Sequence, residues 1–250
     1  MNFHAEFLET GVAREVSDAL PFDVVGGTTS NVAVPGDMGD LILSAAVLTS
    51  GDISFAAGMT EPIRGNAKTP IGELYSSLLD ALPGKPSFLY TLAPILHNIG
   101  GDEFIEAIDE FSGGIPLFGS LAFTHKSDCS GIYTFFNGEH YGDALALVAM
   151  SGDVNPTFLK TSLPEERMIR QKAIITESEK NAIRSINGIP VHEYLESVGL
   201  AENGKINEVG LSSIPLILTL EDKSQVVRSP YAMTEDGDLR RQELRPPIGA

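Results

Sequence analysis

Apolar and polar residues follow two different rhythms along the chain, which predicts a protein with both helices and strands. Where apolar residues recur three and four positions apart, they line one face of a helix. Pro70 opens one such stretch and Gly113 follows another, as proline often starts helices and glycine often ends them. Helices are expected over residues 12–20, 71–82, 102–111 and 190–198.

Short apolar runs between turn residues predict the strands. Strands are expected over residues 3–8, 23–25, 41–48, 53–58, 87–92, 115–118, 132–136, 143–150, 172–176, 182–186, 213–220 and 225–228. The run 41–48 is expected to be a buried strand that turns at Ser50-Gly51-Asp52 and pairs with 53–58. Asn137-Gly138 is expected to form a tight hairpin turn that leads from 132–136 into the strand ending at Met150. The fold class predicted is α/β (α+β mixed), with mixed β-sheets flanked by helices.

One order of elements occurs twice, which predicts an internal duplication. The unit is strand, helix, strand ending in glycine, long apolar strand and return strand. Gly27 corresponds to Gly119, and Ser50-Gly51-Asp52 corresponds to Ser151-Gly152-Asp153. The alternative is that such elements recur in an α/β chain by chance. We expect a first domain over residues 1–165, with halves at about 3–60 and 87–160, and a second region over 166–250.

Composition narrows the class of partner. The chain has 34 acidic and 17 basic residues in 250, a net charge of -17. This charge repels nucleic acid and anionic membrane surfaces and leaves a cationic partner possible. With one cysteine, Cys129, no intrachain disulfide can form. The N-terminus lacks the pattern of a signal peptide, and no apolar run reaches the roughly 20 residues of a membrane helix. A cytoplasmic protein is expected.

No catalytic or metal-binding pattern emerges from the reactive side chains. The five histidines lack the spacing of a zinc site, although a single histidine can ligate haem iron. Cys129 stands in a polar acidic loop, which raises a thiol pKa and disfavours a nucleophile. We therefore expect no enzyme, no metal site and no cofactor, with haem as the alternative.

The best candidate for a ligand site is Gly26-Gly27-Thr28-Thr29. It has neither the lysine of a Walker loop nor the spacing of a dinucleotide-binding loop. Its backbone amides and hydroxyls can still hold a carboxylate or carbonyl. Gly119-Ser120 is the equivalent in the second half, and Arg167 and Arg228 are candidates to pair with a ligand carboxylate. The alternative is that the glycines only let the chain turn.

Several segments together resemble the FIST family of sensory domains. The segments are Phe22–Thr29, Ser112–Ala122, Phe136–Asp143, Ala173–Asn181 and Asn187–Leu195. The first three are similar to the N-terminal FIST segment, and the last two to its junction with the C-terminal segment. On this resemblance residues 166–250 begin the C-terminal segment, and the chain is expected to be trimmed at both ends.

The resemblance implies a non-catalytic domain that binds a small molecule and passes a signal to a fused module or partner protein. Amino acids are the usual ligand proposed for the family, and some members resemble haem-binding sensors of nitric oxide. A third hypothesis, from charge alone, is an acidic scaffold that docks a basic protein.

Overall fold

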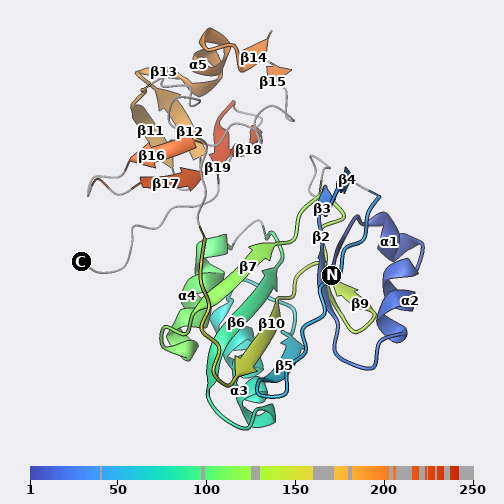
Figure 1. Ribbon diagram of the computed structural model, residues 1–250. Coiled ribbons are helices and arrows are strands. Elements are labelled where there is room, and N and C mark those ends of the chain that lie inside the picture. The colour runs from blue at the N-terminus through green and yellow to red at the C-terminus, as the bar shows by residue number, and fades with distance from the viewer. Residues whose placement is uncertain are drawn as a thin grey trace. The chain divides into compact units, whose positions relative to one another are not determined.

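The computed structural model describes residues 1–39, 41–96, 99–124, 130–159, 172–179, 182–202, 205–206, 216–219, 223, 225–228, 230–233 and 237–241. Within these residues the chain forms helices and several mixed sheets, so the predicted fold class is confirmed. It divides into two compact units, Met1–Phe158 and Leu159–Ala250 (Figure 1). None of the described helices has both the length and the apolar character needed to span a bilayer.

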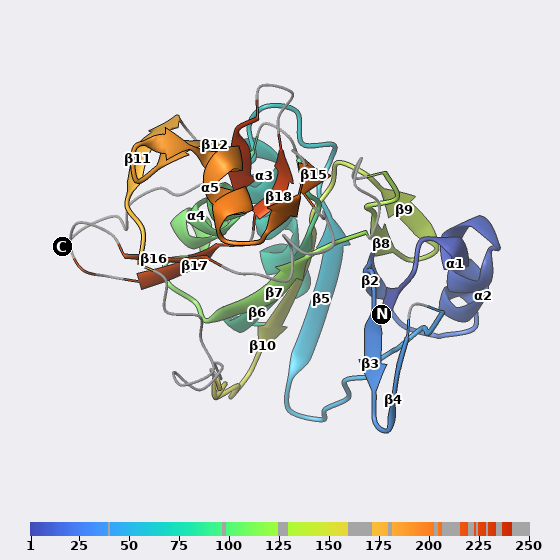
Figure 2. The same ribbon diagram turned by 90° about the horizontal axis from the view of Figure 1, so that it is seen from above.

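The first sheet of the first unit has the strand order β1-β2-β8-β9. Its strands are β1 (Asn2–Phe3), β2 (Val25–Thr28), β8 (Thr134–Phe136) and β9 (Glu139–Tyr141). β1 and β2 run parallel, and the other pairs are antiparallel. Helices α1 (Glu6–Glu9) and α2 (Val12–Asp18) lie beside this sheet (Figure 2). Phe3 and Phe135 meet edge to face at 5.6 Å in its small core.

The second sheet has the order β5-β10-β6-β7. Its strands are β5 (Ser54–Met59), β10 (Ala146–Ser151), β6 (Pro86–Ala93) and β7 (Leu117–Leu121). β10 is antiparallel to both neighbours, whereas β6 and β7 are parallel and joined through a helix. The edge strand β7 has no described neighbour beyond it.

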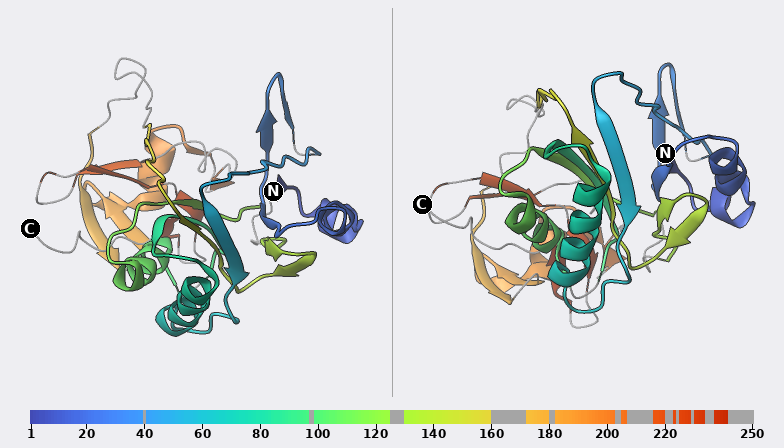
Figure 3. Two further views of the ribbon diagram at one scale, coloured as in Figure 1. Left: turned by 60° about the horizontal axis from the view of Figure 1, so that its bottom comes forward. Right: turned by 90° about the horizontal axis from the view of Figure 1, so that it is seen from below.

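Two helices cover one face of the second sheet, α3 (Lys68–Ala81) and α4 (Gly101–Ser112), and they lie side by side (Figure 3). Their apolar stripes form the largest core with the sheet, because side chains at helical spacing all point to one face. Its buried members include Ile71, Leu74, Leu78, Leu89, Phe104, Ile108, Leu145 and Leu147. The predicted helices at these places are confirmed, with Pro70 in the first turn of α3, where a proline breaks no helical hydrogen bond.

The second unit is built mostly from strands. β11 (Ile175–Glu179), β12 (Ala182–Ile186), β19 (Leu239–Arg241) and β18 (Pro230–Met233) form one sheet in that order, and β13 (Ile189–Pro190) pairs with β12. Helix α5 (Val191–Ser197) packs on this sheet through Val191 and Leu195. Two two-stranded pairs also lie among the described residues of this unit: β14 (Ala201–Glu202) with β15 (Lys205–Ile206), and β16 (Leu216–Thr219) with β17 (Gln225–Arg228).

The strand predicted over residues 41–48 does not form. This segment follows the hairpin of β3 (Val32–Val34) and β4 (Asp37–Gly39), and among the described residues it makes an isolated antiparallel bridge between Ser44 and Asn2. Leu41 and Leu48 are 66% and 62% exposed. β5, its expected partner, pairs with β10 instead, because the neighbour of a strand is chosen by the whole sheet and not by the nearest apolar run. The short strand expected over 3–8 is also wrong, since residues 6–9 are helical.

The Asn137-Gly138 turn is confirmed, but its second strand is β9 and not β10. Asn137 and Gly138 both have positive φ, 46° and 88°, as the tight turn requires. The Asn137 side chain accepts a hydrogen bond from the Val24 N–H at 2.8 Å, and the Asn137 N–H donates to the Val24 carbonyl at 3.0 Å. The turn therefore also holds the start of β2.

The second unit repeats this arrangement at another Asn-Gly pair. Asn187-Gly188 joins β12 to β13, and Asn187 has φ 52°. Its side chain accepts from the Ile174 N–H at 2.8 Å, and its own N–H donates to the Ile174 carbonyl at 2.8 Å. The duplication predicted for 3–60 and 87–160 stays a prediction. The residue-level correspondence that the structure displays is between β2-β8-β9 and β11-β12-β13.

Candidate functional site

The glycines of the predicted site lie inside strands, not at strand ends. Gly26 and Gly27 are in the middle of β2, and Gly119 is the central residue of β7. None of the three has positive φ, so the alternative that they only let the chain turn is wrong. A Cβ on Gly119 would lie 2.1 Å from the Thr91 carbonyl oxygen of β6, and one on Gly26 would lie 2.9 Å from the Met1 carbonyl oxygen. Close approach of a neighbouring backbone is therefore what these two positions require.

Thr28 has a structural role, because its side chain bonds to the backbone of a neighbouring segment. Its side chain is buried, and its hydroxyl accepts a hydrogen bond from the Tyr133 N–H at 2.9 Å and donates to the Tyr133 carbonyl at 3.3 Å. The Thr29 hydroxyl donates to the Asn31 carbonyl at 3.2 Å and is half-buried. Of the two threonines, only Thr29 has its hydroxyl near solvent.

The two glycine-containing strands meet just beyond their carboxyl ends. The Phe123 N–H, two residues after β7, donates to the Thr28 carbonyl at 2.8 Å. The Ala122 N–H donates to the Ala93 carbonyl at 2.7 Å, which continues the β6–β7 pairing. Gly27 faces Ala122 and Leu92, whose side chains would lie 3.6 Å and 3.7 Å from an added Cβ. These hydrogen bonds link the two sheets of the first unit.

Ser120 lies on the face of the second sheet that α3 and α4 leave uncovered. Register aligns Leu92 with Ser120 and Tyr90 with Phe118 on neighbouring strands, and Phe88 is two residues from Tyr90. Alternate residues of a strand share a face, so these side chains point the same way. The face carries no charged side chain among the described residues, and its members are Phe55, Ala57, Met59, Phe88, Tyr90, Leu92, Phe118, Ser120, Ala146, Val148 and Met150.

Four rings form a row on this face, which we call the aromatic face. Phe118 lies 6.3 Å from Tyr90 and 6.4 Å from Phe158, and Phe158 lies 6.4 Å from Phe88, measured between ring centroids. Phe118 is 57% exposed and Phe158 54%. Burial raises the pKa of the Tyr90 hydroxyl above its ordinary value, because the phenolate would be poorly solvated there. None of the four rings is among the site residues predicted from the sequence, although Phe88 and Tyr90 stand at alternate positions of an expected strand.

The described residues do not place either predicted arginine at these strands. Arg167 lies outside the described residues, and Arg228 ends β17 in the second unit. Of the histidines, His4 is buried and its Nδ1 accepts from the Glu6 N–H, while the His140 ring stands edge-on to Tyr133. His97, His125 and Cys129 also lie outside the described residues. Across the described part of the chain, no group of three His, Cys, Asp or Glu residues could hold a metal ion.

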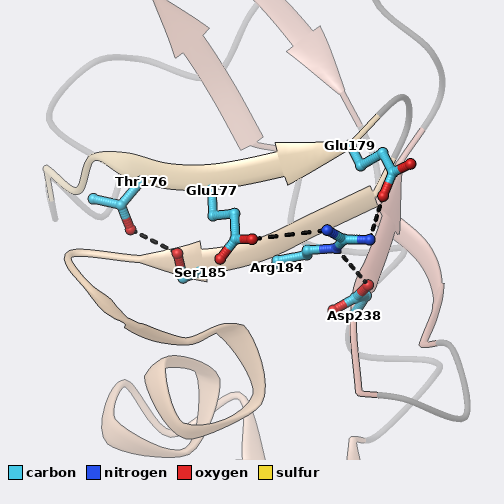
Figure 4. Close-up of polar contacts among 6 residues, drawn as sticks. All are labelled: Thr176, Glu177, Glu179, Arg184, Ser185 and Asp238. Atoms are coloured by element: carbon cyan, nitrogen blue, oxygen red, sulfur yellow. Dashed lines mark hydrogen bonds and ion pairs between the residues drawn. The ribbon is translucent and has the colours of Figure 1, made fainter.

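Arg184 forms a cluster of three ion pairs among the described residues of the second unit (Figure 4). Its guanidinium pairs with Glu179, lies 3.7 Å from the Glu177 carboxylate and lies 3.5 Å from the Asp238 carboxylate. These residues come from β11, β12 and the segment before β19, so the cluster ties neighbouring strands together. Because the Arg184 side chain is 44% exposed, solvent screens these pairs and their stabilisation is small.

An open groove of about 590 Å³ runs along α3 where α4 ends beside it. Its lining residues are Thr69, Gly72, Glu73, Ser76, Ser77, Asp80 and Phe111. It lies on the helix-covered side of the second sheet, away from the aromatic face.

Comparison with families of known proteins gives one match, and comparison with curated proteins and with solved structures finds none. The match is to the model of the FIST N domain, over residues 3–189. It spans the whole of the first unit except its first two residues and continues through β11 and β12 to the start of β13. A match over most of the chain settles the family that the sequence segments suggested: this protein belongs to the FIST N domain family, a family of sensory domains.

Proposed function

We propose that the protein is a non-catalytic sensory domain that binds a small ligand and transmits its presence to a signalling module or partner protein. The observation that carries this proposal is the family match over residues 3–189.

The aromatic face is the surface that best suits a small ligand. Aromatic rings bury large apolar area and favour stacked or edge-to-face contact with an apolar group. The hydroxyls of Tyr90 and Ser120 stand among them and can orient a polar end by hydrogen bonding. Ser120 belongs to the site predicted from the sequence, together with Gly119 on the same strand. The predicted stretch Gly26-Gly27-Thr28-Thr29 then supports the end of β7, because the Thr28 carbonyl accepts a hydrogen bond from the Phe123 N–H.

An amino acid with an apolar side chain is the ligand we test first. Its side chain would contact Phe118 and Phe158, and its polar end would face the Ser120 hydroxyl. The experiment is calorimetric titration of the purified chain with the twenty amino acids, followed by the variants Phe118→Ala and Ser120→Ala. Phe22→Ala is the matched control, because Phe22 is also exposed, at 47%, and lies outside the aromatic face.

We expect weaker binding in both aromatic-face variants and unchanged binding in the control. Equal affinity in all three variants would move the site elsewhere, and no heat with any amino acid would count against amino acids as the ligand class. Haem is the second candidate ligand, from the family resemblance. A visible spectrum of protein expressed with added haem decides it, because bound haem gives a Soret band.

A further inference from the structure

The groove along α3 has an aromatic wall that a glycine makes possible. A Cβ on Gly72 would lie 2.5 Å from Cζ and 2.8 Å from Cε1 of Phe111, so any larger residue there would displace the ring. The Phe111 ring is thus seated directly against the α3 backbone, 39 residues away in sequence, and is still 41% exposed. The Phe111 ring therefore has a fixed position and a surface that is exposed to solvent.

The polar groups of the groove are arranged as hydrogen-bond acceptors. The Ser76 hydroxyl donates its proton to the Gly72 carbonyl at 2.8 Å, and the Ser77 hydroxyl donates to the Leu74 carbonyl at 2.8 Å. Each oxygen therefore presents only lone pairs outward. Glu73 and Asp80 add two exposed carboxylates. A ligand that fits this lining is rich in N–H donors.

The groove carries uncompensated negative charge. Helix α3 has one basic residue, Lys68, and two carboxylates, Glu73 and Asp80, which both line the groove. Lys68 does not neutralise them, since its Nζ pairs with the Glu110 carboxylate at 2.6 Å. None of the described basic side chains pairs with Glu73 or Asp80. A cation placed between these carboxylates and the Phe111 ring gains both an ion pair and a cation–π contact.

We propose that this groove docks a basic segment of a partner protein, with two arginine or lysine side chains that reach Glu73 and Asp80. The two carboxylates are seven residues apart on one helix, about 10.5 Å along its axis. An extended chain covers about 10 Å in three residues. The partner motif is therefore two basic residues spaced i and i+3 in an extended segment. Phe111 contacts the stem or the guanidinium of one of them.

The test uses a ten-residue peptide with two arginines three positions apart, titrated into the full chain by fluorescence anisotropy at low salt. Comparison peptides have the same composition with adjacent arginines, or citrulline in place of both arginines. The protein variants are Glu73→Gln with Asp80→Asn, and Phe111→Leu. Glu9→Gln with Glu15→Gln is the matched control, because it also removes two negative charges, from exposed helical positions outside the groove.

We expect the groove double variant to weaken peptide binding about tenfold. It removes two solvent-exposed ion pairs, and the cation is then no longer held beside the Phe111 ring. Phe111→Leu should weaken it less, and the control pair should leave it unchanged. Binding should fall as salt rises, because exposed charges are screened. Equal loss in both double variants, equal affinity for the adjacent-arginine peptide, or no binding of any arginine peptide would each overturn the proposal.

The inference extends the proposed function by naming the chemistry of a partner, and it can fail separately. The groove and the aromatic face lie on opposite sides of the second sheet. The groove variants leave the amino-acid titration unaffected, and the aromatic-face variants leave the peptide titration unaffected, if both sites are as described.

Discussion

Replacing Thr28 by valine tests whether this residue belongs to the fold or to the ligand site. Valine has the shape of threonine without the hydroxyl, so the change deletes two hydrogen bonds with little change in volume. The Tyr133 N–H then loses its 2.9 Å acceptor beside a side chain that is only 2% exposed. A donor left without a partner in a buried place costs about 1–3 kcal/mol.

For a unit of this size, each kcal/mol shifts the melting temperature by about 2–4 °C, so Thr28→Val should lower it by about 2–12 °C. Thr29→Val is the control. Its hydroxyl makes one hydrogen bond near solvent, and the expected loss is under about 0.5 kcal/mol. Scanning calorimetry of the two variants and the parent chain gives the comparison.

Amide hydrogen exchange gives a local measurement for the same variant. The Tyr133 amide should exchange faster in Thr28→Val and stay protected in Thr28→Ser, which keeps the hydroxyl. If Thr28→Val melts with the parent and the Tyr133 amide keeps its protection, the hydroxyl does not hold the two strands together. The case for Thr28 as a direct ligand contact would then be reopened.

Three further predictions concern stability. Gly119→Ala should destabilise the chain far more than Gly27→Ala in denaturant unfolding, because the added Cβ meets the Thr91 carbonyl in the first case and makes ordinary contacts in the second; equal effects would show that β7 can shift freely. Gly138→Ala should cost about 1 kcal/mol, since alanine disfavours the positive φ of this turn, and an unchanged unfolding midpoint would contradict the turn geometry. Tyr90→Phe should make the free energy of unfolding less sensitive to alkali. The raised pKa of Tyr90 means that the folded state holds the phenolic proton more tightly than the unfolded state. The stability that Tyr90 contributes in this way is complete below about pH 10 and is lost as the pH rises further. Urea melts of parent and Tyr90→Phe on both sides of that pH check this, and parallel pH profiles would show that Tyr90 is not responsible.

The sequence by itself determined the parts of the fold that depend on neighbouring residues. The apolar stripes of α3 and α4 appear at helical spacing in the sequence, with Pro70 in the first turn of one and Gly113 after the other. Asn137-Gly138 predicted a tight turn because few other pairs accept positive φ at both positions. The same local signals, read as strands and helices in alternation, were enough for the α/β class.

Tertiary structure alone decided which strands pair and what each glycine is for. Residues 41–48 look like a strand, yet β5 pairs with β10, a choice made by a segment about 90 residues further along. The sequence suggests a ligand site or a turn at Gly119, but the structure requires glycine there because the Thr91 carbonyl on the next strand lies so close. Gly72 gave no signal, because the ring that needs its missing Cβ comes from α4. The aromatic face and the α3 groove are assembled in the same way. Each depends on contacts between residues far apart in the chain, and apolar periodicity reports only the neighbours within one helix or strand.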